Sequence, residues 1–192
     1  MDYQCYTFNA NAAEQLPYDI LTAQEQLLPP IKRWARILLR QELAARLGIE
    51  PQAVQFFRNE HGKPFTTKIH FNISHSSHLL CMAFHHTPIG VDIQHCINKH
   101  SITKLANRIM CPEQFRAFTN NGSKLHEFYN CWCIAEALVK YYGAGIWSAK
   151  AYPFILREHG IDFLFEQAPK VELFRPAEGF CGAVAYKLTA CQ

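Results

Sequence analysis

Three short apolar segments fall between residues 69 and 93, and they constrain the fold more than any other feature of the chain. They cover residues 69–73, 79–84 and 89–93, and the links between them are rich in Ser, His and Pro. Each segment is too short for a stable helix but has the length of a strand bounded by turns. The pattern therefore predicts three consecutive strands joined as antiparallel hairpins.

Helices are predicted on both sides of these strands. Pro29 and Pro30 open one over about residues 30–47, and Gly48 ends it; another covers about residues 124–142, ending at Gly143. A third helical region, residues 101–120, is interrupted near residues 110–112. Further strands are predicted at residues 1–8, 54–57, 155–158, 163–166 and 182–188. The order of elements indicates an α+β fold with antiparallel hairpins.

Composition narrows the classes of function. The chain has 49% hydrophobic and 18% charged residues, which is typical of a globular protein. Its net charge is +3 and its longest basic run is Lys32-Arg33, so a nucleic-acid partner is not expected. No apolar stretch approaches the roughly 20 residues of a membrane helix. The start lacks a secretory signal, which predicts a cytoplasmic protein whose eight cysteines, Cys191 included, are reduced.

The sequence Phe-Asn-Ile-Ser-His-Ser at residues 71–76 ends the first of the three strands. Ser74 and His75 offer a hydroxyl and an imidazole at a strand end, where such groups hold phosphate oxygens well. The alternative is that Asn72 and Ser74 only satisfy a turn. A serine hydrolase is disfavoured, because no Gly-x-Ser-x-Gly elbow surrounds Ser74.

The sequence Gly-Val-Asp-Ile-Gln at residues 90–94 contains a candidate cation ligand. Strand alternation sends Asp92 and Gln94 to the same face of the third strand. Mg²⁺ prefers oxygen ligands, a few from the protein and the rest from phosphate and water. The alternative is a solvated acid at a strand end.

Glu136 and Lys140 share one face of the helix predicted at residues 124–142, because they are four residues apart. An ordinary exposed ion pair is the simplest interpretation. Trp132 lies on the same face, however, and the surrounding residues are largely apolar. A Glu and a Lys in such surroundings need a partner, for example a metal ion or a phosphate.

Together with Gly62-Lys63-Pro64, these segments resemble the Sfp-type phosphopantetheinyl transferase family. The four motifs occur in the order of the family and at similar separations, between about residues 62 and 145. The basic helix upstream and Cys111-Pro112-Glu113 are similar more loosely. Two positions depart from the family pattern. Gln94 replaces a frequent glutamate, which removes an anionic metal ligand, and Ala135 replaces a lysine beside Glu136.

The resemblance implies a particular form of the α+β fold. Two similar halves would be related by a pseudo-twofold axis, with the active site between them. Residues 1–96 would form the N-terminal half and residues 97–192 the C-terminal half, with a boundary near residues 94–99. It also implies a monomer, because the two halves supply what a smaller homologous class builds from separate subunits.

The resemblance further implies transfer of phosphopantetheine from coenzyme A to a serine of an apo acyl or peptidyl carrier protein. Adenosine 3',5'-bisphosphate would leave. Asp92 and Glu136 would hold Mg²⁺, with Gln94 as a neutral ligand, directly or through water. Glu136 would also accept the serine proton, and Lys140 would neutralise charge on the pyrophosphate.

Further residues would bind coenzyme A. Ser74 and His75 would contact phosphate oxygens, and Lys63 with Pro64 would border the nucleotide. Lys32 or Arg33 would meet the 3'-phosphate, although the register of that helix is left open.

Two other functions remain as alternatives. One is a catalytically weakened module that binds coenzyme A or a carrier protein, which Gln94 suggests. The other is a structural metal-binding protein, supported by His85-His86 and by Cys131 with Cys133. Fatty-acid, polyketide and nonribosomal peptide carriers are all possible substrates.

Overall fold

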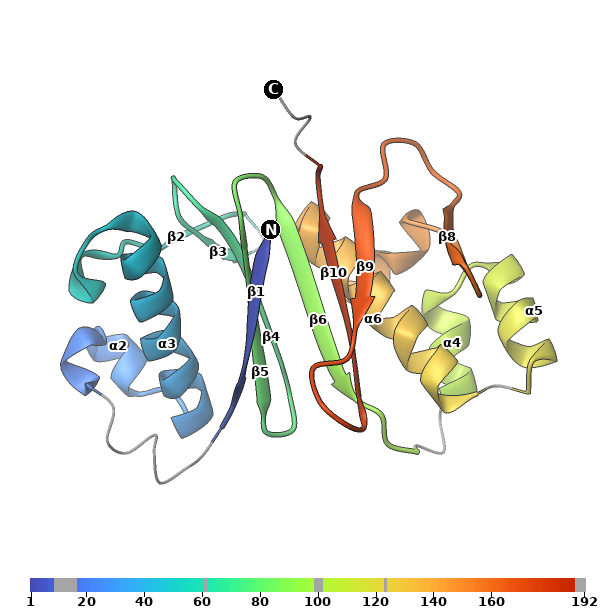
Figure 1. The fold of residues 1–192 in the computed structure, drawn as a ribbon, viewed down its shortest axis with the longest axis horizontal. Coiled ribbons are helices and arrows are strands. Elements are labelled where there is room, and N and C mark those ends of the chain that lie inside the picture. Colours follow the sequence, from blue (N-terminus) through green and yellow to red (C-terminus); the bar gives the residue numbers. More distant parts are fainter. Residues whose placement is uncertain (9–16, 61, 99–101, 123, 189–192) are drawn as a thin grey trace.

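A computed structural model describes residues 1–8, 17–60, 62–98, 102–122 and 124–188. Helices and sheets form successive layers: an N-terminal helix over residues 30–47, a first three-stranded sheet, a second three-stranded sheet, and a group of helices between residues 102 and 142 (Figure 1). All strand pairings are antiparallel. The prediction of an α+β fold with antiparallel strands is therefore confirmed. Of the three consecutive strands predicted between residues 69 and 93, the first two form a hairpin, whereas the third pairs with residues 180–186 in the other sheet. Residue 99 of the predicted boundary and Cys191 lie outside the described residues.

The first sheet and its helix come from the N-terminal part of the chain. Strands β1 (Asp2–Thr7), β4 (His70–Ser76) and β5 (Leu79–His85) pair in the order β1-β5-β4. Helix α3 (Pro30–Leu47) has Pro30 in its first turn and ends at Gly48, whose φ of 66° is left-handed. Apolar residues of α3 and the sheet form one core, which includes Trp34, Leu43 and Met82.

The second sheet repeats this arrangement with later elements. Strands β6 (Ile89–His95), β9 (Lys170–Phe174) and β10 (Phe180–Tyr186) pair in the order β6-β10-β9. In both sheets the first strand pairs with the last, and the last with the middle one. Helices α4 (Ile102–Ile109), α5 (Pro112–Asn120) and α6 (Leu125–Tyr142) follow β6, so the predicted interruption near residues 110–112 is confirmed.

Short elements connect the layers. The strand predicted at residues 54–57 is wrong in its bounds. The 3₁₀ helix η2 (Pro51–Ala53) ends just before residue 54, and the strand β2 (Phe57–Arg58) covers only two residues. Strand β9 was not predicted, and the strand expected at residues 163–166 lies earlier, as β8. The remaining short elements are η1 (Tyr18–Ile20), α2 (Ala23–Gln26), β3 (Pro64–Phe65), η3 (Ile146–Ala151), β7 (Phe154–Arg157) and β8 (Gly160–Phe163).

Side chains of β4 join the two sheets. Asn72 accepts a hydrogen bond from the Val91 backbone N–H at 2.9 Å, and Ser74 accepts one from Ile93 at 3.2 Å. Ser76 accepts a third from His95 at 2.9 Å. Every second residue from Asn72 to Ser76 thus accepts a hydrogen bond from an N–H on the edge of β6, where the sheet provides no strand neighbour. The sequence suggested a strand that ends at residue 73. In the structure, strand β4 continues through Ser76.

Gly90 allows α6 to lie directly on β6. A Cβ atom at this position would be 2.0 Å from the Ala137 carbonyl oxygen and 2.5 Å from the Tyr141 backbone nitrogen, both of α6. Because these are backbone atoms, a side chain could be accommodated only by moving the helix. This contact brings the face of α6 that carries Glu136 and Lys140 toward Asp92. Among the described helices, none is both long enough and apolar enough to cross a membrane.

Candidate active site

Asp92 is the centre of the site. It lies in β6 and is 2% exposed. Its Oδ1 accepts hydrogen bonds from the Ser74 hydroxyl and from the Lys140 ammonium, each at 2.7 Å, and its Oδ2 accepts one from the Gln94 amide at 3.0 Å. A buried carboxylate needs such partners to remain charged. Three predicted site residues therefore converge on Asp92.

Lys140 reaches Asp92 from helix α6. Besides the ion pair, its ammonium donates to the Val91 carbonyl oxygen at 3.1 Å. An ammonium group has three N–H donors. Two of them have acceptors among the described residues, and the third is available to a ligand. The side chain is 25% exposed, so part of it is accessible to a ligand.

Glu136 lies one helical turn before Lys140 and is partly buried. Burial raises the pKa of its carboxyl group; the charge of Lys140 opposes that shift, and the charge of Asp92 adds to it. In the part of the chain that the structure describes, no hydrogen bond or ion pair is found for this carboxylate. Two carboxylates that repel each other in a partly desolvated site are suited to sharing a cation.

Gln94 and Ser74 contact Asp92 in different ways. The Gln94 amide donates to Asp92, and its oxygen remains as an acceptor. The Ser74 hydroxyl both donates to Asp92 and accepts from Ile93, and the residue is buried. In the structure this hydroxyl supports Asp92 from within the protein, and the phosphate contact expected for Ser74 stays a prediction.

A cavity of about 630 Å³ lies beside this cluster. The turn at Gly62 and Lys63, the Asn72 side chain and the end of α6 line it, so Lys63 and Lys140 meet there. The Lys63 ammonium donates to the Lys140 carbonyl oxygen at 2.5 Å. Burial, with a further contribution from the charge of Lys140, lowers the pKa of Lys63 to about 8. Two lysines in one cavity favour an anionic ligand.

Other predicted residues lie apart from Asp92. His75 is exposed and, by strand alternation, faces away from Ser74, toward the side of the sheet that α3 covers. Pro64 pairs with Arg58 in the ribbon of β2 and β3. Lys32 is exposed in the first turn of α3, and the Arg33 guanidinium donates to the Gln26 carbonyl oxygen at 3.1 Å.

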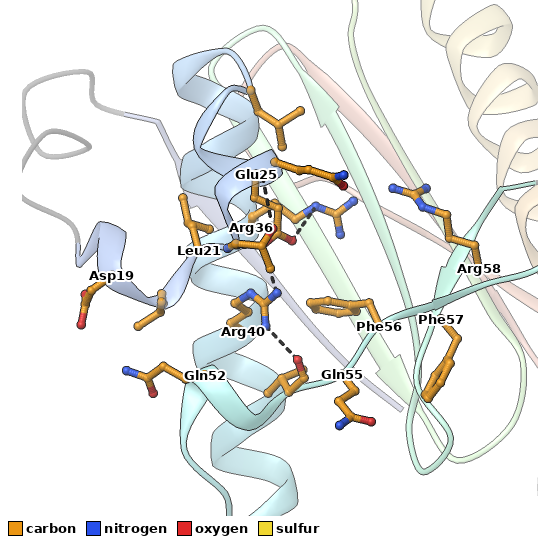
Figure 2. A pocket seen from close by; sticks show the side chains of 15 residues that line it. Asp19, Leu21, Glu25, Arg36, Arg40, Gln52, Gln55, Phe56, Phe57 and Arg58 are labelled. Atoms are coloured by element: carbon orange, nitrogen blue, oxygen red, sulfur yellow. Dashed lines mark hydrogen bonds and ion pairs between the residues drawn. The ribbon is translucent and has the colours of Figure 1, made fainter.

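A second cavity, of about 760 Å³, lies between α2, α3 and the segment before β2 (Figure 2). Its lining includes Arg36, Arg40 and Arg58 together with Asp19 and Glu25, which leaves an excess of positive charge. Arg40 is fixed by Glu25 at 2.9 Å and by the Val54 carbonyl oxygen at 2.8 Å. Arg36 is 3.9 Å from Glu25, and burial lowers its pKa.

Arg36 and Arg40 were not among the residues predicted from the sequence. Their spacing contained the signal, because Lys32, Arg36 and Arg40 follow at intervals of four residues and therefore share one helix face. Arg58 connects the two cavities: it lines the second one and donates at 2.8 Å to the carbonyl oxygen of Gly62, which lines the first.

The residues around Asp92 fit Mg²⁺. Asp92, Glu136 and Gln94 offer hard oxygen atoms, the ligand type that Mg²⁺ prefers. The raised pKa of Glu136 indicates a carboxylate whose charge the protein compensates only in part. A cation held by few protein ligands leaves positions for phosphate oxygens and water. The arrangement therefore suits binding and polarisation of a pyrophosphate.

Comparison with known proteins agrees with this chemistry. The model of the 4'-phosphopantetheinyl transferase superfamily matches residues 88–187. The chain is 30% identical to the 4'-phosphopantetheinyl transferase gsp of Aneurinibacillus migulanus over 160 residues, 81% of the chain and 65% of that protein. It is 31% identical to HetI of a Nostoc species over 58% of the chain, and 27% identical to Sfp of Bacillus subtilis over 57%. The matches cover between half and 65% of these relatives' own lengths.

Proposed function

Since the chain belongs to the 4'-phosphopantetheinyl transferase superfamily, we propose that it transfers phosphopantetheine from coenzyme A to a serine of an apo acyl or peptidyl carrier protein. The observation that carries the proposal is the cluster of Asp92, Lys140 and Glu136, formed where α6 lies on β6. We further propose that the chain acts as a cytoplasmic monomer. Residues 1–96 and 97–192 would form its two halves, related by a pseudo-twofold axis. The common strand order of the two sheets supports this division.

The reaction forms one bond and breaks another. The oxygen of the carrier serine attacks the β-phosphorus of coenzyme A, and the bond from that phosphorus to the bridging oxygen breaks. Adenosine 3',5'-bisphosphate leaves with the bridging oxygen. Catalysis of phosphoryl transfer depends mainly on positioning and on neutralising charge.

Each residue of the cluster has a role in this proposal. Asp92, Glu136 and the Gln94 oxygen hold Mg²⁺, which neutralises charge on the pyrophosphate when bound. Ser74 fixes the orientation of Asp92 through its two hydrogen bonds. Glu136 accepts the serine proton, a role that its raised pKa supports. Lys140 donates its remaining N–H to the pyrophosphate.

Coenzyme A extends from this cluster toward the second cavity. Lys63 contacts the pyrophosphate in the first cavity, and Pro64 borders the nucleotide. Arg58 lies between the two cavities and marks the direction of the ligand. We assign the 3'-phosphate to Arg36, one turn after Lys32 and Arg33, because Arg36 lines the cavity and those two residues do not. His75, which is exposed on the α3 side of the sheet, remains a proposed phosphate contact.

Intact mass spectrometry of the carrier tests the function. The chain is incubated with coenzyme A, Mg²⁺ and a panel of apo carriers from fatty-acid, polyketide and nonribosomal peptide systems. Transfer adds the mass of phosphopantetheine, and a carrier with Ser→Ala at its modified serine provides the negative control. Coenzyme A binding without any mass gain across the panel would instead support the weakened binding module that Gln94 suggests.

A further inference from the structure

Three potential metal ligands meet at the end of the second sheet where β6 ends and β10 begins, outside the site described above. Cys96 directly follows β6, Cys181 lies in β10, and His126 lies in the first turn of α6. The Sγ atoms of Cys96 and Cys181 are 3.1 Å apart, and Cys181 Sγ is 4.0 Å from His126 Nδ1. All three ligand atoms lie within 4.8 Å of one another. Within the described ranges, no other group of three Cys, His or acidic side chains comes this close.

The β6–β10 pairing brings the two thiols together. Gln94 is paired with Cys181 across the ladder, and the Cys96 N–H donates to the Gly179 carbonyl oxygen at 2.7 Å. This last bond extends the pairing of the two strands beyond His95. Helix α6 packs over both strands, so its first turn places His126 beside the thiols. The cluster is thus assembled from residues far apart in the sequence by three elements with extensive mutual contacts.

We propose that Cys96, Cys181 and His126 bind a thiophilic divalent cation, with Zn²⁺ as the best fit. Two thiolates and an imidazole are a ligand set that Zn²⁺ takes, and the group contains no hard oxygen donor that would favour Mg²⁺ or Ca²⁺. Zn–S bonds of about 2.3 Å in a tetrahedron separate two sulfur atoms by about 3.8 Å. The two thiols need to move apart by less than an ångström to reach that geometry.

The fourth ligand is water. His126 is exposed, so the cluster opens to solvent on its side, while Cys181 closes the inner side. Binding replaces the S–H proton of each cysteine by a bond to the metal and releases both protons to the buffer. Cys133, which donates to the Cys181 carbonyl oxygen at 3.5 Å, is not among the three ligands. The site therefore differs from the cysteine and histidine pairs that the sequence alone suggested, Cys131 with Cys133 and His85 with His86.

The same three elements carry the candidate active site. Cys96 is two residues after Gln94, and His126 lies in the first turn of the helix that carries Glu136 and Lys140. A cation at this position fastens the end of β6 to β10 and to the start of α6. It would stabilise the packing that positions Asp92 against α6, without contacting coenzyme A. The proposal does not depend on the transferase function, because its test measures metal binding.

A titration with Co²⁺, which gives visible spectra where Zn²⁺ does not, tests the site. The full chain is stripped of metal, reduced with a phosphine, and titrated. We expect one equivalent of Co²⁺ with thiolate charge-transfer absorption and the intense visible bands of a tetrahedral ion, both removed by Zn²⁺. Loss of an outer-shell partner already costs about 10–100-fold in metal affinity, so Cys96→Ala, Cys181→Ala and His126→Ala should each weaken binding at least tenfold.

Cys133→Ala is the matched control and should retain the spectrum, because it removes a neighbouring buried thiol that is not a ligand. Cys181 is buried, so Cys181→Ala could prevent folding. His126 is exposed, so His126→Ala should fold and still tests the site. The proposal is overturned if no charge-transfer band appears, or if His126→Ala and Cys96→Ala bind Co²⁺ as the unchanged chain does. It is also overturned if mild peroxide joins Cys96 to Cys181 in a disulfide while the reduced chain binds no metal.

Discussion

The ammonium nitrogen of Lys140 lies 2.7 Å from Oδ1 of Asp92, so the carboxylate that we assign to the metal already has a cationic partner in the free protein. The ion pair allows Asp92 to remain charged while 2% exposed. In the proposed mechanism Mg²⁺ would share this carboxylate with Lys140, whose remaining N–H would meet the pyrophosphate. Without Mg²⁺, Lys140 is the cationic partner of Asp92, so the stability of the free protein should depend on Lys140.

The first prediction concerns this ion pair. Lys140→Met should destabilise the metal-free protein by about 2–4 kcal/mol, because it leaves a buried carboxylate without its cation and the pair is only partly exposed. Asp92→Asn in the same chain should recover much of the loss, since the charge that needed a partner is gone. Urea unfolding of the unchanged chain, the two single variants and the double variant measures the coupling. A coupling near zero would show that the pair does not stabilise the fold.

The second prediction concerns Glu136. Its pKa is raised in the folded protein, mainly by burial, so the carboxyl favours folding when protonated and loses this contribution as the pH rises through the folded pKa. Glu136→Gln removes the charge and should melt above the unchanged chain at pH 8 without Mg²⁺. The difference should vanish near pH 4, below the ordinary pKa. Transfer should fall about 10²–10⁴-fold, the contribution of a general base. A lower melting temperature of the variant at pH 8 would contradict the assignment.

The sequence predicted the main elements because their ends are encoded locally. Pro30 and Gly48 bound α3, and Gly143, with a φ of 74°, ends α6. Strand alternation likewise placed Asp92 and Gln94 on one face, and helical spacing placed Glu136 and Lys140 on one face. That the two pairs meet in one site was expected only from the resemblance to the family. Helix ends and face periodicity depend only on residues close together in the sequence, so they can be predicted without knowing the fold.

Features that depend on contacts between distant segments were not predictable in this way. Ser74 supports Asp92 because β4 lies along the edge of β6, a relationship that no local pattern contains. Arg36 forms a cavity with Arg58 only after α3 packs beside the segment before β2. Cys96 and Cys181 meet through the register of β6 and β10, 85 residues apart in the chain.

The third prediction concerns Lys63. Its pKa of about 8 in the free protein should rise when a phosphate binds, because the anion favours the charged ammonium. Coenzyme A binding near pH 8.5, without Mg²⁺, should therefore take up protons, by about half a proton or more per site. Calorimetry in buffers of different ionisation enthalpy measures this uptake. Lys63→Met should abolish it, whereas Lys68→Met, at an exposed lysine of the same region, should not. Equal uptake by both variants would remove Lys63 from the site.

The fourth prediction concerns the 3'-phosphate. Arg36→Ala should weaken binding of coenzyme A by about 10–100-fold, the value of a hydrogen bond to a charged group. The substitution should weaken binding of dephospho-coenzyme A, which lacks the 3'-phosphate, much less. With this ligand, neither the unchanged chain nor Arg36→Ala can form the contact between residue 36 and that phosphate. Lys32→Ala is the matched variant, four residues earlier on the same helix face. If Lys32→Ala shows this selectivity and Arg36→Ala does not, the phosphate binds at the start of α3 instead.

The fifth prediction concerns Gln94 and the metal. The Gln94 amide donates to Asp92 at 3.0 Å, so Gln94→Glu replaces that bond by repulsion between two carboxylates. The variant should melt below the unchanged chain without Mg²⁺ and be stabilised more strongly when Mg²⁺ is added. A third carboxylate also attracts the cation more than a neutral amide does, so transfer by the variant should need less Mg²⁺. Gln94→Ala is the control: it loses the hydrogen bond without gaining a charge, and its Mg²⁺ requirement should not fall.

Calorimetry extends this prediction to the coupling between metal and substrate. With two carboxylates and one amide, the unchanged chain should bind Mg²⁺ weakly on its own, and coenzyme A should tighten it because the pyrophosphate supplies further oxygen ligands. Thermodynamic linkage requires that Mg²⁺ tighten coenzyme A by the same factor. Gln94→Glu should bind Mg²⁺ more tightly in the absence of coenzyme A. The factor by which coenzyme A tightens Mg²⁺ binding should therefore be smaller in this variant. Equal Mg²⁺ affinity with and without coenzyme A, or full transfer in the presence of a chelator, would exclude a cation shared by Asp92, Glu136 and the pyrophosphate.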